Sequence, residues 1–235
     1  MNKVNSKLEP PTWYLLDSGA RPAAENMALD EVLLDSAPKL GHPVLRFYQW
    51  TEAAATFGYF QKFAEVERLT ALRPLVRRPT GGGLVPHDAD WTYSLVFPPD
   101  DSWYRLKAVE SYRRLHEWIQ AAFQKTGTAA DLSPESNKEL RGHCFSGPEQ
   151  FDVIWRGHKI AGAAQRRTRR GLLIQGSIQP PPNATKAPWQ EAFCEICRDQ
   201  WSVTWLPFQW EPTWDERISK LAREKYGTRP YNERR

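Results

Sequence analysis

Apolar side chains recur every three or four residues in several stretches of the chain, which is the spacing of one face of an α-helix. We expect helices in residues 23–36, 106–125, 187–199 and 211–226. The second stretch is the clearest, because Gly127 follows it and glycine favours the backbone conformation found just after a helix end. Its apolar face consists of Val109, Tyr112, Leu115, Ile119, Ala122 and Phe123.

Short apolar runs rich in β-branched and aromatic residues predict strands between these helices. The expected strands are residues 44–50, 53–59, 91–97, 151–155, 160–165 and 172–178. The last three are joined by short turns, so we expect an antiparallel meander. Residues 130–142 are polar and contain Pro134, which predicts an exposed loop. The pattern as a whole predicts a sheet with helices packed against it.

Length and composition favour one globular domain. The chain has 235 residues, of which 40% are hydrophobic, with 11 Trp, 10 Phe and 8 Tyr, and such a chain buries a substantial core. We expect a polar lead-in over residues 1–11 and a single domain over residues 12–235. Apolar runs stay far below the ~18 residues of a membrane-spanning helix, and three cysteines suggest no disulfide framework. These features predict a cytoplasmic protein that does not contact membranes.

Positive charge is concentrated rather than evenly spread. The net charge is +4, and four arginines lie close together at Arg166, Arg167, Arg169 and Arg170. Such a run is typical of a solvated hairpin tip. No recognised nucleic-acid-binding motif accompanies it, so we expect no nucleic-acid partner.

Three consecutive glycines, Gly81 to Gly83, are the most informative feature of the chain. Glycine loses more backbone entropy on ordering than any other residue, so this run weakens a helix or a strand. It suits a place where the backbone approaches a ligand closely or takes a positive φ. For the glycines alone, a flexible turn between two strands is the simpler explanation. The flanking Arg77, Arg78 and His87 favour a ligand site.

Four sequence blocks resemble, in the same order, the lipoate–protein ligase and octanoyltransferase family. The two strong blocks are RRPTGGGLVPHD at residues 77–88, followed by TYS at 92–94, and GHKIAGAAQR at residues 157–166, followed by QGSI at 175–178. The two weaker blocks are NMALDE at residues 26–31 and KYGT at residues 225–228. The resemblance covers residues 12–231, nearly the whole chain.

The resemblance implies an α/β (α+β) fold in which helices pack on a mixed, largely antiparallel sheet, as in the catalytic domains of biotin and lipoate protein ligases. It implies an enzyme that attaches an octanoyl or lipoyl group to a specific lysine of lipoyl domains or of a glycine-cleavage H-type protein. The implied acyl donor is acyl carrier protein. Because these carrier domains are acidic, the basic segment would raise the encounter rate with them.

By the same resemblance, two groups of residues bind the acyl substrate. The first group is Arg78, Thr80, Gly81, Gly82, Gly83, Leu84, Val85 and His87, and the second is Gly162, Ala163, Ala164, Gln175 and Gly176. Asp90 departs from the family pattern, which usually has a glycine at that position. The departure concerns the path of the loop after His87.

Cys144 decides between reaction types. A lone cysteine is most often a small buried hydrophobic residue, but Arg141, His143 and Lys159 would lower the pKa of this thiol if they lie close to it. Cysteine-dependent octanoyltransferases of the ligase-like branch carry a cysteine at the matching position, and ATP-dependent lipoate ligases do not depend on one. The resemblance therefore implies that Cys144 is the nucleophile.

Lys159 has two interpretations. In most hairpins a strand lysine is exposed and has no special role. Here a run of small residues follows it, from Ala161 to Ala164, which lets a ligand lie against the backbone. An ammonium beside an acyl carbonyl can stabilise the oxyanion of acyl transfer, so we predict that Lys159 is catalytic.

Cys194 and Cys197 form a Cys-x-x-Cys pair inside the helix expected at 187–199. Neither a second pair nor a nearby histidine accompanies them, so zinc is disfavoured. A redox role is disfavoured too, because the βαβ context of such motifs is missing. We expect Phe193, Ile196 and Cys197 to face the core. The match of the glycine loop accounts for His87 and Asp88, and we predict no bound metal.

Several functions remain open from the sequence. In the first, Cys144 carries the octanoyl group as a thioester, and the reaction needs no cofactor. In the second, the protein is an ATP- and magnesium-dependent lipoate ligase that needs a separate accessory chain, because we expect no accessory domain after residue 210. A lipoyl amidotransferase is a third alternative. A non-enzymatic acyl-binding scaffold is a fourth, and the presence of both Cys144 and Lys159 disfavours it.

Overall fold

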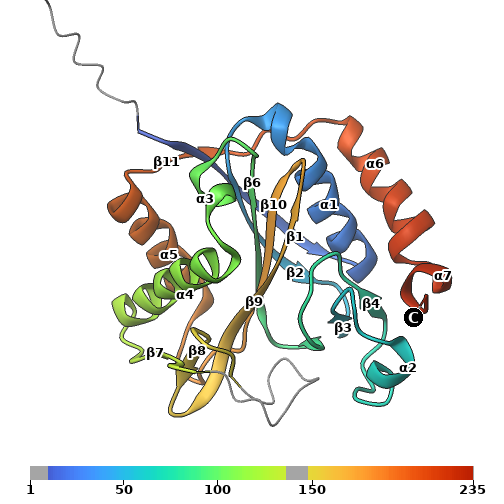
Figure 1. The fold of residues 1–235 in the computed structure, drawn as a ribbon, viewed down its shortest axis with the longest axis horizontal. Helices are drawn as coiled ribbons and strands as arrows, with labels where there is room; N and C mark the ends of the chain where they lie inside the picture. Colours follow the sequence, from blue (N-terminus) through green and yellow to red (C-terminus); the bar gives the residue numbers. More distant parts are fainter. Residues whose placement is uncertain (1–9, 136–147, 235) are drawn as a thin grey trace, which may run out of the picture.

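The computed structural model describes residues 10–135 and 148–234. A large mixed sheet forms its centre (Figure 1). In sheet order the strands are β11 (Thr204–Pro207), β1 (Thr12–Arg21), β2 (Val44–Trp50), β6 (Trp91–Phe97), β10 (Gly171–Ile178), β9 (His158–Thr168), β8 (Val153–Trp155) and β7 (Asp131–Leu132). β1 runs parallel to β2 and to β11, and every other neighbouring pair is antiparallel. The predicted fold class, a largely antiparallel mixed sheet with packed helices, is confirmed.

A smaller sheet lies beside the large one and carries the glycine loop. Its strands, in order, are β4 (Leu75–Arg77), β3 (Ala54–Phe57) and β5 (Val85–His87). The loop of residues 78–84 connects β4 to β5, which pair with opposite edges of β3. The strand that directly follows the glycine loop is therefore β5, which comes before the strand expected at residues 91–97.

Helices cover both faces of the large sheet (Figure 1). On one face lie α4 (Ala108–Lys125) and α5 (Lys186–Trp201), and on the other lie α1 (Ala23–Leu40) and α6 (Thr213–Leu221). Neighbouring residues on a strand point to opposite faces, so Leu45 and Leu95 pack toward α4 and α5, while Val44 and Val96 pack toward α1. The shorter helices are α2 (Phe63–Val66), α3 (Ser102–Arg105), the π-helical turn η1 (Ala222–Tyr226) and α7 (Arg229–Asn232).

Some predicted elements need correction. The helix expected at 211–226 is divided into α6 and η1, and the loop expected at 130–142 contains the short strand β7. The first helix continues to Leu40 instead of ending at residue 36. Strands β1, β4, β5 and β11 are not among the elements expected from the sequence.

Candidate active site

Two rows of residues cross the large sheet on the face that α1 covers. Directly opposite residues on paired strands point to the same face, so the strand register alone brings these side chains together. The first row is Arg46, Ser94, Gln175 and Ala164, and the second is Tyr48, Thr92, Ser177 and Gly162. Many of these side chains are small, which leaves space between the large sheet and the small one.

A cavity occupies this space. It is lined by Met27, Tyr48, Trp50, Thr56, Arg78, Val85, His87, Thr92, Gly162, Ala163, Ala164, Gln175, Gly176 and Ser177. Apolar walls with a few polar groups are typical of a small-molecule site. Eight of the predicted substrate-binding residues line it: Arg78, Val85, His87, Gly162, Ala163, Ala164, Gln175 and Gly176.

The other predicted residues lie in or beside the glycine loop. Leu84 points into the core of the small sheet, and Thr80 is fully buried. Gly82 has a φ of 82°, a conformation that side chains other than glycine rarely adopt. A Cβ added to Gly58 would collide with the carbonyl of Gly82, so Gly58 is also required for the loop to pack where it does.

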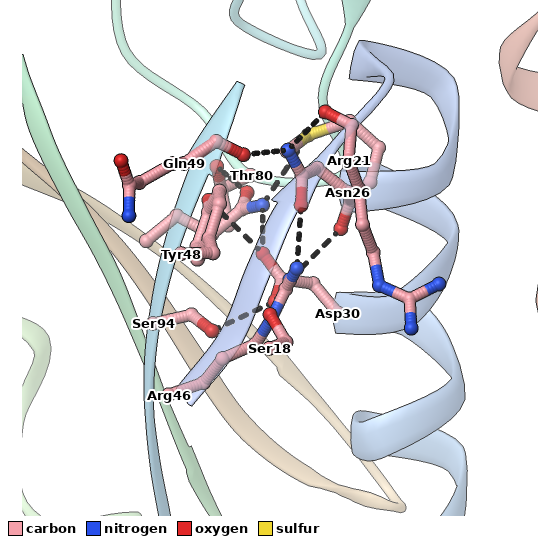
Figure 2. Close-up of polar contacts among 11 residues, drawn as sticks. Ser18, Arg21, Asn26, Asp30, Arg46, Tyr48, Gln49, Thr80 and Ser94 are labelled. Atoms are coloured by element: carbon pink, nitrogen blue, oxygen red, sulfur yellow. Dashed lines mark hydrogen bonds and ion pairs between the residues drawn. The ribbon is translucent and has the colours of Figure 1, made fainter. Parts of the chain in front are cut away.

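A fully buried ion pair joins Arg46 of β2 to Asp30 of α1 (Figure 2). The Arg46 guanidinium donates to Asp30 of α1 at 2.6 Å, and it also donates to the Asn26 side chain at 2.5 Å and to the Ser18 hydroxyl at 2.8 Å. Ser94 donates to Asp30 at 2.7 Å. A buried charge is costly unless it is paired and hydrogen-bonded, and here both partners are.

The ion pair extends to the glycine loop through an amide. The Gln175 amide nitrogen donates to Asp30 at 2.7 Å, and the Thr80 hydroxyl donates to the Gln175 amide oxygen at 2.7 Å. This hydrogen bond therefore joins the glycine loop to Gln175, which lines the cavity.

A histidine–carboxylate pair forms another wall. The ring of His87 is buried, with Nδ1 2.9 Å from the Asp90 carboxylate and Nε2 2.8 Å from the Thr56 hydroxyl. Asp90 also accepts hydrogen bonds from the hydroxyls of Thr92 and Ser177. Because both ring nitrogens are engaged, His87 is fixed in orientation.

The Lys159 side chain lies against Gly162, the last residue of the second row, and Lys159 itself is not among the residues that line the cavity. Its ammonium forms a 2.7 Å ion pair with Asp152, and the two side chains are 4% and 0% exposed. Asp152 also accepts a hydrogen bond from the Tyr112 hydroxyl of α4. A Cβ on Gly162 would lie 2.8 Å from the ammonium nitrogen, so the lysine occupies the space that a side chain at residue 162 would need. The interpretation of Lys159 as an exposed strand residue is wrong.

The two arginines of the glycine-loop motif have different positions. Arg77 is fully buried and donates to the backbone carbonyl of Asn232 and to two carbonyls of segment 59–61. It therefore joins the C-terminal residues to the small sheet. Arg78 lines the cavity and donates to the Gly81 carbonyl at 2.6 Å.

The predicted nucleophile, Cys144, lies outside the described residues, as do Arg141 and His143. Burial raises the pKa of the Cys194 thiol to about 12 and raises that of Cys197 as well, so neither is a thiolate at neutral pH. Phe193 and Cys197 face the core as expected. Within the described ranges, no group of three or more His, Cys, Asp and Glu side chains is arranged to hold a metal ion, and no helix is long and apolar enough to cross a membrane.

The fold is that of lipoate–protein ligases. The crystal structure of lipoate-protein ligase A bound with ATP matches with a TM-score of 0.74 at 20% sequence identity, over 95% of this chain and 98% of that chain. The structure of a bi-partite lipoate protein ligase from Thermoplasma acidophilum matches with a TM-score of 0.70 at 19% identity, over 95% of this chain and 96% of that chain.

Sequence comparison identifies the family. Residues 22–186 match the lipoyl protein ligase A/B catalytic domain, and the chain belongs to this family. The octanoyltransferase LipM of Lysinibacillus sphaericus is 38% identical over 180 residues, which cover 71% of this chain and 65% of that relative. The chain thus spans less than two thirds of the relative's length. The resemblance that the motifs indicated is confirmed.

Sequence reasoning missed several residues of the site. Thr92 and Ser177 lie in the motif blocks at 92–94 and 175–178, and Tyr48 lies in the strand expected at 44–50. Only the register of the paired strands shows that their three side chains share one wall of the cavity. Asp30 and Arg46 could have been found from the sequence, because each is a charged residue within an apolar run. Charged residues are rarely buried unless they are paired, so this pattern predicts an ion pair.

Proposed function

We propose that the protein is an acyltransferase of protein lipoylation that moves an octanoyl group onto a lysine of a lipoyl-domain protein. The position of Lys159 supports this most directly, because its ammonium lies buried against Gly162, and Gly162 lines the cavity. A fixed cation in a site of low polarity stabilises the oxyanion that develops on an acyl carbonyl. The membership of the family and the activity named for the relative support the same reaction.

The proposed route has two transfers. The Cys144 thiolate attacks the thioester carbonyl of octanoyl-acyl carrier protein, a new C–S bond forms, and the carrier thiolate leaves and takes up a proton. The amine of the acceptor lysine then attacks the Cys144 thioester. The amide bond forms, the C–S bond breaks, and the proton released by the amine passes to the departing thiolate. The thioester already carries the activation, so the proposed route consumes no ATP.

Residues in the cavity and beside it have distinct proposed roles in this route. The small residues of β9 and β10 make room for the acyl chain against the sheet. Lys159 stabilises the oxyanion in both transfers, and Asp152 and Tyr112 hold its ammonium in place. The acceptor is a lipoyl domain or a glycine-cleavage H-type protein.

The intact mass of the protein after incubation with octanoyl-acyl carrier protein, without ATP, tests the proposal. We expect the mass to rise by one octanoyl group, hydroxylamine to remove the adduct, and Cys144→Ser to prevent it. An acceptor domain added to the acylated protein should gain the octanoyl group.

The same assay separates the alternatives. A ligase forms no adduct without ATP and modifies the acceptor when it is supplied with free lipoate, ATP and magnesium. An amidotransferase takes the acyl group from an octanoylated lipoyl protein but not from acyl carrier protein. A scaffold transfers nothing in any arm, and each of these three results overturns the proposal.

A further inference from the structure

The acyl cavity lies between two separate sheets, so its width depends on how the sheets are joined. The glycine loop belongs to the small sheet, whereas Gln175 belongs to the large one. The hydrogen bond from the Thr80 hydroxyl to the Gln175 amide oxygen joins them at 2.7 Å, and both side chains are buried.

Asp30 determines the direction of the Thr80–Gln175 hydrogen bond. An ionised carboxylate only accepts hydrogen bonds, so the Gln175 amide must present its NH₂ group to Asp30 and its oxygen to Thr80. Asp30 is itself held by Arg46 and Ser94 (Figure 2). The ion pair therefore orients the amide that receives the loop.

The backbone of the loop is attached to its own sheet by other contacts. The Thr80 carbonyl accepts a hydrogen bond from the Tyr59 amide at 2.9 Å, and the Gly81 carbonyl accepts one from Arg78 at 2.6 Å. A second bond from the loop to the large sheet, from Arg166 to the Pro79 carbonyl, is longer at 3.3 Å. The small sheet is also joined to the large one beyond the loop, where His87 of β5 and Ser177 of β10 both bind Asp90. Loss of the Thr80 hydroxyl should therefore leave the loop intact and loosen its distance from the large sheet.

We propose that the chain of hydrogen bonds from Asp30 through Gln175 to Thr80 sets the width of the acyl cavity and so selects straight acyl chains over branched ones. This inference rests on the proposed acyl transfer. Thr80 and Gln175 are then positioning residues that act on specificity through the spacing of the two sheets.

The test compares two donors, octanoyl-acyl carrier protein and 4-ethyloctanoyl-acyl carrier protein, by the ratio of their kcat/KM values. In an apolar pocket one or two extra methylenes are discriminated by roughly 10-fold or more. Thr80→Val has the shape of threonine but lacks the hydroxyl, and we expect it to lower the ratio by most of that factor. Thr80→Ser keeps the hydroxyl and should restore most of the selectivity.

A double-mutant cycle checks that the two residues act as a unit. Gln175→Leu should lower the ratio as Thr80→Val does, and the double variant should lower it no further. Thr126→Val, at the end of α4, is the matched control for the same chemical change away from the cavity. Thermal unfolding measures stability separately, because a loss of folded protein lowers the measured rates with both donors by the same factor and leaves their ratio unchanged.

The outcomes are distinguishable. If the wild type transfers octanoate and Thr80→Val has the wild-type ratio, the hydrogen bond does not set the width and the inference is wrong. If Thr80→Ser loses selectivity as Thr80→Val does, the hydroxyl is not the cause and the inference is also wrong. If the wild type transfers neither group, the proposed function itself fails.

Discussion

Substitution of Gly162 by alanine adds one methyl group where the Lys159 side chain lies. The new Cβ would be 2.7 Å from the Lys159 Cε and 2.8 Å from its Nζ, against an ordinary contact distance of at least 3.4 Å. The ammonium must therefore move by about 0.6 Å or more, the difference between 2.8 and 3.4 Å. It would move away from a position that the ion pair with Asp152 now fixes.

The fold should tolerate this change. Gly162 does not have a positive φ, and the atoms that must yield first belong to the end of a flexible side chain. Replacing glycine by alanine also lowers the conformational entropy of the unfolded chain. This stabilises the folded state by about 0.4–1 kcal/mol and offsets part of the steric cost. We expect the free energy of unfolding to stay within about 1 kcal/mol of the wild type.

Activity should respond far more strongly than stability. A misplacement of about 1 Å in a catalytic group costs on the order of 100-fold in rate, which corresponds to about 2.7 kcal/mol. Single-turnover acylation by octanoyl-acyl carrier protein measures this loss, with urea unfolding as the measure of stability. Lys159→Ala should lose a similar factor in acylation and in onward transfer, because it removes the oxyanion donor.

The double variant tests the reasoning. Because both changes act on the same ammonium, Gly162→Ala should add little to the loss caused by Lys159→Ala. A folded Gly162→Ala protein with the wild-type rate would refute the role assigned to the lysine. A fully additive double variant would show instead that the methyl group blocks the acyl chain directly.

Three further predictions concern other parts of the chain. Cys144→Ser should abolish the octanoyl adduct and the transfer, whereas Cys197→Ser should retain transfer with lower stability, because it buries a hydroxyl; transfer by the Cys144 variant, measured by intact mass, would contradict the thioester route. Gly82→Val should abolish transfer and cost about 1–3 kcal/mol in thermal or urea unfolding, because valine is strained at a φ of 82°; normal turnover would remove the loop from the site. Burial lowers the pKa of His116 to about 4. Between pH ~6.5 and ~4 this histidine is therefore protonated in the unfolded chain but not in the folded one. The free energy of unfolding should fall by roughly 3 kcal/mol as the pH is lowered through that range. His116→Gln should remove that part of the pH dependence, and an unchanged profile would contradict the assignment.

Elements with a strong local signal could be predicted from the sequence. The stretch 106–125 has an apolar face and a following glycine, and α4 occupies Ala108–Lys125. β1 was missed because Asp17, Ser18 and Gly19 interrupt its apolar pattern. The strand forms because it pairs along both edges, with β2 and β11, and it accommodates the interruption as an irregularity in register between Asp17 and Ala20. Such pairing is non-local, and the residues of one strand do not encode it alone.

Only part of the candidate site could be predicted from the sequence, because the rest of it also depends on non-local strand pairing. The glycine loop and the block around Lys159 are contiguous in sequence, so a motif can reveal them. Tyr48, Thr92 and Ser177 come from different strands and meet only because the register aligns them. Their shared property, a row on one face of a sheet, exists only once the strands have paired.

Asp90, which stands where the family pattern usually has a glycine, has a clear structural role. A carboxylate at this position accepts hydrogen bonds from His87, Thr92 and Ser177, none of which a glycine could accept through a side chain. The Asp90 carboxylate therefore joins the loop between β5 and β6 to Ser177 of β10. Because His87 also binds this carboxylate and lines the cavity, the residue that breaks the pattern helps to fix a wall of the site.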